Sequence, residues 1–293
     1  MGETENIYGK KSYEFAVGRI KANSHRPFSA EQWNRLREAD LPSAEKILIE
    51  YGYPPVPEGK TIFDSIAEER ERTIEFIRDA APEAELVDLL FFEEDAVNLK
   101  LFLKAGRMDP APASLPVRAG GMDPELLRIC AYTEDFTLLG TPAQDMLRGV
   151  CAETDPRKIS CQVDNAMFCR ALRIAERKHC ASLTRLLTEY GTGRNRRTAL
   201  RLVKLGADPG RYPEAFLPVG GEWYKTADHG KTEREILTDV NKRLAAVTEE
   251  LGYDTGMGAV AQYYFMKKNE AAALRMLFTE KSFAAAGGAA ANG

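Results

Sequence analysis

Apolar residues recur along this chain with the spacing of amphipathic helices. The first stripe combines Tyr13, Ala16, Val17 and Ile20, which fall at positions i, i+3, i+4 and i+7. Ser29 and Gln32 then have the spacing of a capping box, which predicts a short helix beginning directly after Ser29. The N-terminal part of the chain is therefore expected to be a series of short helices.

Two further helices are expected before residue 82. One begins at Pro42-Ser43 and ends at Gly52, because glycine often follows the last helical residue. The other covers the stripe from Thr61 to Ile77 and ends before Pro82, where proline does not continue a helix.

The segment 94–104 carries polar residues on its apolar side. Asp95, Asn98, Leu99 and Phe102 share one face of the predicted helix. The two polar side chains on this stripe are expected to be half-buried, and each then needs a hydrogen-bond partner. The acidic run Glu93–Asp95 is typical of a helix start, where it interacts with the helix dipole and the solvent.

A second unit repeats this order of features. One or two helices are predicted between Val163 and Leu187, and the segment Asn195–Arg201 follows them. A helix that carries an Asn and, two places on, a basic residue thus occurs twice. Some two dozen residues after each Asn stands a Gly-Gly step, at 120–121 and again at 220–221. A repeat of this length predicts stacked helical lobes.

The last third of the chain contains two strong helical stripes. The first runs from Ile236 to Leu251 and the second from Val260 to Phe278. Residues 284–293 are only Ala, Gly and Asn, which predicts a flexible tail. No run of alternating β-branched residues indicates a sheet, so the predicted fold class is all-α.

Composition narrows the class of protein. The chain has 293 residues, 44% of them hydrophobic and 29% charged, as in an ordinary folded protein. A net charge of -4 gives no general attraction to nucleic acid or anionic lipid. Five cysteines without a Cys-x-x-Cys pair, after a polar N-terminus, favour reduced thiols in the cytoplasm. No apolar run approaches the roughly 20 residues that cross a bilayer, so no direct membrane span is expected.

Two groups of residues suggest chemistry. His229–Thr232 contains the Gly-Lys-Thr end of a phosphate-binding loop, but the glycine five places earlier is replaced by Lys225. His179-Cys180 with Cys161 and Cys169 matches no standard zinc spacing, and core packing is the simpler interpretation. We expect neither a cofactor nor a metal.

Basic residues and one carboxylate suggest contacts instead of catalysis. The cluster Arg194, Arg196, Arg197 and Arg201 has no interleaved aromatic residues for stacking on bases, so a salt-bridged face is expected rather than a nucleic-acid site. Glu270 and Arg275 are five apart and pair poorly with each other on one helix. Each is expected to meet another segment of this chain or a partner protein.

Taken in order, these motifs resemble one protein family. Tyr13–Ile20 resembles the opening helix of the rotary ATPase subunit called C in prokaryotes and d in eukaryotes. Asp95–Lys100 is similar to the Asp-x-x-Asn-Leu-Lys helix of that family. Asn195–Arg201 is similar to its second copy, although Thr192 stands where an Asp is expected. Lys267 to Arg275 resembles the closing Lys-x-x-Glu-x-x-x-x-Arg helix.

The resemblance implies a funnel-shaped, quasi-threefold subunit of three similar helical lobes. The lobes would span residues 1–115, 116–217 and 218–283, followed by the tail. Such a subunit is not catalytic. It couples the central-stalk subunits to the membrane ring of a V- or A-type rotary ATPase, at the cytoplasmic surface of the membrane. The resemblance assigns structural or partner contacts to Asp95, Asn98, Lys100, Asn195, Arg197, Arg201, Glu270 and Arg275.

Two other classes remain as alternatives. Leu205–Pro209 resembles the turn after an ankyrin helix pair, which would make the chain a helical-repeat adaptor. The Thr-Pro-Leu-His signature of ankyrin repeats is missing, and the period here is near a hundred residues instead of 33. A small helical enzyme would depend on the same His and Cys residues.

Overall fold

The computed structural model describes residues 11–22, 27–106, 115, 117–219 and 231–291, with side chains to residue 285. Every regular element in these ranges is helical, which confirms the all-α prediction. None of the described helices is long and apolar enough to cross a membrane.

The chain forms two compact units, and the first contains both of its ends. Unit 1 consists of residues 1–82 and 259–293, and unit 2 of residues 83–258. The limits of the three lobes that the family resemblance implies stay predictions.

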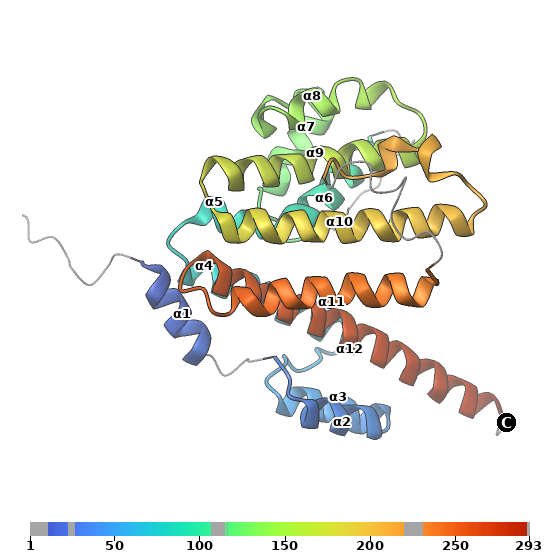
Figure 1. Ribbon diagram of the computed structural model, residues 1–293. Coiled ribbons are helices and arrows are strands. Elements are labelled where there is room, and N and C mark those ends of the chain that lie inside the picture. Colours follow the sequence, from blue (N-terminus) through green and yellow to red (C-terminus); the bar gives the residue numbers. More distant parts are fainter. Residues whose placement is uncertain (1–10, 23–26, 107–114, 116, 220–230, 292–293) are drawn as a thin grey trace, which may run out of the picture. The chain divides into compact units, whose positions relative to one another are not determined.

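The described residues of unit 1 form four helices from the first part of the chain and most of the last helix. They are α1 (Tyr13–Ala22), α2 (Ala30–Glu38), α3 (Leu41–Glu50), α4 (Ile62–Ala80) and α12 (Met257–Ala291) (Figure 1). The core joins residues from both ends of the chain, among them Leu36, Leu48, Ile66, Leu274 and Phe278.

Unit 2 contains the helices between these two chain segments. They are α5 (Ala84–Asp88), α6 (Phe92–Ala105), α7 (Pro124–Thr133), α8 (Ala143–Leu147), α9 (Pro156–Arg177), α10 (Ala181–Lys204) and α11 (Glu233–Leu251). Short 3-10 turns link several of them. The long helix α9 packs against α6, α8 and α10, and α10 packs in turn against α11 (Figure 1). Leu99, Phe102, Leu127, Val163 and Met167 belong to the core of this unit.

The helix starts follow from capping chemistry. Ser29 and Gln32 form the predicted capping box of α2, and Thr232 with Glu235 forms another at α11. The start of α3 differs from the prediction, because Asp40 accepts the N–H of Ser43 and α3 therefore begins at Leu41, before Pro42.

Two other boundaries differ from the sequence pattern. The segment expected as one or two helices up to Leu187 is two helices, and the second, α10, runs on through the Asn195 region to Lys204. The last helix continues beyond Phe278 to Ala291, so it includes most of the stretch expected as a flexible tail.

Candidate functional site

Asn98 connects the middle of α6 to the segment before α7. Its side chain is completely buried. The amide oxygen accepts the N–H of Arg118 at 2.9 Å, and the amide nitrogen donates to the carbonyl of the same residue at 2.8 Å. Because one side chain satisfies both backbone groups of a non-helical residue, it holds the connector firmly against the helix.

Asp95 fixes the same connector one helical turn earlier. Its carboxylate accepts the N–H of Met122 at 3.0 Å. The Gly120-Gly121 step is needed for this approach: a Cβ on Gly120 would lie 2.0 Å from the Asp95 oxygen, and one on Gly121 would lie 2.3 Å from the carbonyl oxygen of Asp88. The first Gly-Gly step thus has a steric reason that the sequence alone does not reveal.

The environment of Asp95 also changes its acidity. Burial raises the pKa of the Asp95 carboxyl to about 7, against the lowering effects of the Met122 N–H and the nearby Arg170. Asp95 and Asn98 were expected to be half-buried, and this was wrong, because both are fully enclosed between α6 and its neighbours. The acidic run Glu93–Asp95 lies in the first turn of α6, as expected, but it is not fully solvated, since Glu94 is buried as well.

Asn195 repeats the Asn98 contact in the middle of α10. Its amide oxygen accepts the N–H of Leu217 at 2.7 Å, and its amide nitrogen donates to the carbonyl of Leu217 at 2.8 Å and to that of Val219 at 3.2 Å. Thr192 does not reproduce Asp95, because its hydroxyl donates to the carbonyl of Thr188 within the helix. The Gly-Gly step at 220–221 lies outside the described residues.

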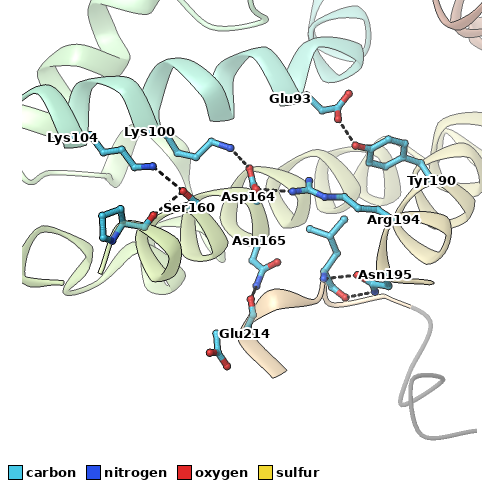
Figure 2. A network of polar contacts seen from close by, with 12 residues as sticks. Glu93, Lys100, Lys104, Ser160, Asp164, Asn165, Tyr190, Arg194, Asn195 and Glu214 are labelled. Carbon is cyan, nitrogen blue, oxygen red and sulfur yellow. Dashed lines mark hydrogen bonds and ion pairs between the residues drawn. The ribbon is translucent and has the colours of Figure 1, made fainter. Parts of the chain in front are cut away.

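A network of polar contacts joins three helices of unit 2 (Figure 2). Asp164 on α9 accepts from Lys100 on α6 at 2.7 Å with one oxygen and from Arg194 on α10 at 2.6 Å with the other. Lys104 adds a second contact from α6 to α9, through the Ser160 hydroxyl at 3.0 Å. Tyr190 on α10 donates to Glu93 on α6. The Asp164 carboxylate therefore links α6, α9 and α10.

The basic face of α10 is salt-bridged, as expected, over part of its length. Arg196 is buried and pairs with Asp239 of α11 at 2.6 Å, which lowers the pKa of that carboxyl. Arg197 donates to the side chain of Asn241 at 2.6 Å. Arg201 is exposed, and its side chain has no polar partner among the described residues.

In unit 1, the buried polar residue that resembles Asn98 and Asn195 in its contacts is Glu270, on α12. Its carboxylate accepts the N–H of Phe28 at 2.7 Å, the hydroxyl of Tyr53 at 2.8 Å and the ammonium of Lys267 at 2.6 Å. Lys267 also lies 3.3 Å from Glu69 of α4. Burial, together with the charge of Glu270, raises the pKa of Tyr53, so its hydroxyl stays protonated and can donate. Glu270 thus meets other segments, as expected, whereas Arg275 is exposed.

Sequence patterns did not single out several of the partners in these contacts. Asp164, Glu69, Tyr53 and Asp239 are ordinary polar positions in the sequence. The signal for Asp164 is a polar residue next to the buried Val163, but such positions are common on amphipathic helices. Choosing among them requires knowledge of which helices pack together.

The other candidate chemistry has local explanations. Thr232 of the Gly-Lys-Thr segment caps α11, accepting the N–H of Glu235, while His229 and Gly230 lie outside the described residues. Over the part of the chain that the structure describes, no group of three or more His, Cys, Asp or Glu side chains could hold a metal ion.

Comparison with known proteins identifies the family. Residues 16–229 match the family described as ATP synthase (C/AC39) subunit, and this chain belongs to it. It is the family of the non-catalytic stalk subunit, C or d, of V- and A-type rotary ATPases. A search of curated proteins found no match. The match covers most of α1 and all of α2 to α10, including both Asn contacts, and it replaces the ankyrin-like and enzyme alternatives.

Proposed function

We propose that this chain is the coupling subunit that seats the central stalk of a rotary ATPase on its membrane ring. The observation that carries this proposal is the family match over residues 16–229. The buried polar contacts agree with a mechanical task, because they connect helices and connectors with satisfied hydrogen bonds and use no activated nucleophile. The chain would work in the cytoplasm at the membrane surface, bound through the complex.

We also infer that the subunit has three similar lobes. The support is a contact that recurs three times: a buried polar side chain on a long helix accepts the N–H of a connector residue. The pairs are Asn98 with Arg118, Asn195 with Leu217, and Glu270 with Phe28. Each connector leads to a capped helix start, at Asp123, Thr232 and Ser29 respectively.

The third contact differs in its connectivity. Phe28 precedes Glu270 by 242 residues, whereas Arg118 and Leu217 follow their Asn by 20 and 22. A threefold arrangement that closes on itself would require this, because the connector of the last helix must then come from the other end of the chain. The lobe limits at 115, 217 and 283 remain predictions.

Arg201 and Arg275 fit best as contacts to other subunits. Both are exposed and have no side-chain ion pair among the described residues, whereas Lys100, Asn195 and Glu270 are engaged within their own units. A charge that is not used inside the fold is available to a partner.

The test is purification of the rotary ATPase from cells that carry an affinity tag on this chain. We expect central-stalk and ring subunits to co-purify, and we expect the isolated chain to hydrolyse no ATP. Deleting the chain should leave ATP hydrolysis by the soluble head but abolish the ion transport that depends on it. Recovery of the chain with unrelated proteins only would refute the proposal.

A further inference from the structure

Helix α7 presents an apolar stripe to the outside of unit 2. Leu126, Ile129 and Tyr132 are 42%, 46% and 47% exposed, although they recur every three residues like core positions. The helix does have an inner face, because Leu127 and Cys130 are buried in the core of unit 2. α7 is therefore apolar on two sides, and the described residues of unit 2 cover only one of them.

Charge around the stripe is strongly acidic. Residues 123–135 contain four carboxylates and one guanidinium, a net charge of -3. The single cation, Arg128, is bound to Glu125 at 2.8 Å and lies over the ring of Tyr132, 5.4 Å from its centre. The remaining carboxylates, on Asp123, Glu134 and Asp135, are exposed at the two ends of the helix, where Asp123 accepts the N–H of Glu125 and Asp135 accepts the N–H of Thr137.

From this pattern we propose that the outer face of α7 binds a basic amphipathic helix of a neighbouring ATPase subunit. The proposal rests on the coupling function proposed above. Carboxylates at both ends of an apolar stripe attract Lys and Arg and repel like charge. They therefore disfavour an anionic lipid surface, and they disfavour a second copy of this chain, which would bring the same net charge to the contact.

The contacts of α7 within unit 2 would let such a partner transmit force to neighbouring helices. The helix begins directly after the connector that Asn98 and Asp95 hold, and Asp123 at its first turn accepts the N–H of Glu125. At its other end, Tyr132 lies so close to Gly106 that a Cβ there would be 3.1 Å from the ring. A force applied to the outer face of α7 thus passes to α6 at both ends and then, through Lys100 and Asp164, to α9.

Site-specific cross-linking in the intact ATPase tests this proposal. The photoreactive residue p-benzoylphenylalanine is placed at Ile129 and, as a matched control, at Tyr253, which is 84% exposed in the same unit but lies outside α7. We expect the probe at 129 to cross-link to a Lys- or Arg-rich helix of another subunit, and the probe at 253 to give no such product.

Substitution gives the energetic test. Ile129→Glu is expected to lower the retention of the chain in the purified complex by about 10-fold, since a central apolar contact is replaced by a like charge. Tyr253→Glu should leave retention unchanged. Both purified variants are compared by circular dichroism and thermal unfolding, so that a folding defect is recognised.

The possible outcomes distinguish a failure of the α7 proposal from a failure of the proposed coupling function. If the chain is in the complex but the probe at 129 cross-links to lipid, to a second copy, to residues 1–82 or to nothing, the α7 proposal is wrong and the coupling function stands. If the unmodified chain is absent from the complex, the coupling function is wrong, and the α7 proposal fails with it.

Discussion

The polar contacts at Asn195 and at Glu270 solve the same structural problem with different chemistry. In unit 2, a neutral amide matches the N–H and the carbonyl of one connector residue. In unit 1, a carboxylate accepts three donors and is accompanied by a buried Lys267 and Glu69. An amide needs no counter-charge, whereas a buried carboxylate requires a whole group of partners.

The two contacts differ in what their removal would leave buried without a partner. Removing Asn195 leaves backbone groups without a partner, and these are neutral. Removing Glu270 also leaves a buried ammonium with a single, more distant carboxylate, because Glu69 lies 3.3 Å from Lys267 while Glu270 lies at 2.6 Å. The charged contact should therefore be the costlier one to break.

Glu270→Ala is expected to have the largest effect, a loss of about 3–5 kcal/mol in the free energy of unfolding, because it isolates buried donors and a buried charge. Denaturant titration measures the loss. Hydrogen exchange should locate it in α2, α3 and α12, with α9 and α10 less affected. The control is Glu280→Ala, an exposed carboxylate on the same helix. Equal stability of the two variants would contradict the comparison.

Asn195→Ala should cost less, about 2–3 kcal/mol, because it orphans neutral backbone groups of the connector. Asn195→Asp should be at least as harmful, since the carboxylate cannot donate to the carbonyls of Leu217 and Val219 and would repel them. Thermal and denaturant unfolding measure both. Asn34→Ala, at an exposed position, is the control, and an Asn195→Asp variant as stable as the unsubstituted chain would refute this account.

Gly120→Ala is expected to destabilise by about 1–3 kcal/mol through overpacking, since the new Cβ would press on the Asp95 carboxylate. Gly18→Ala in α1 is the matched control: a Cβ there meets nothing within 4 Å. That control should be neutral or gain about 0.5–1 kcal/mol from helix propensity. Denaturant titration should therefore show a loss of stability for Gly120→Ala and none for Gly18→Ala, and equal changes would contradict the steric argument.

Asp95 should make stability fall as pH rises from about 4 to 7. The folded-state pKa of about 7 lies above the unfolded value, so the folded protein binds more protons across this window. The contribution is at most one proton, a slope of about 1.4 kcal/mol per pH unit. Asp95→Asn, which keeps an acceptor for the Met122 N–H, should remove this part of the slope. An unchanged profile would show that Asp95 does not titrate in this range.

Asp164→Asn should have the smallest effect, about 1–2 kcal/mol, because its partners Lys100 and Arg194 keep partial access to water. Raising the salt concentration should reduce the difference from the unsubstituted chain. Asp145→Asn removes one carboxylate of an exposed pair with Arg148 and serves as the control. If both variants behave alike, the three-helix contact adds no stability beyond an ordinary surface pair.

Much of the fold was predictable because its signals are local. The stripes at Thr61–Ile77 and Val260–Phe278 correspond to helices α4 and α12, and the Ser29 capping box forms as expected. The boundaries failed where a neighbouring residue supplied a different cap, as Asp40 does for α3. Asn98 and Asn195 were found as polar residues on helices that repeat an order of motifs, which needs no knowledge of packing.

The helical class, the family and the helix positions of Asn98, Asn195 and Glu270 follow from the sequence alone, because periodicity, capping and motif order depend on residues close together in the chain. The tertiary structure alone revealed the partners: Asp164 between Lys100 and Arg194, Tyr53 and Glu69 beside the Lys267–Glu270 pair, and a first unit built from both chain ends. Such pairings join residues up to 242 positions apart, and they are selected by the packing of whole helices, which no local pattern records.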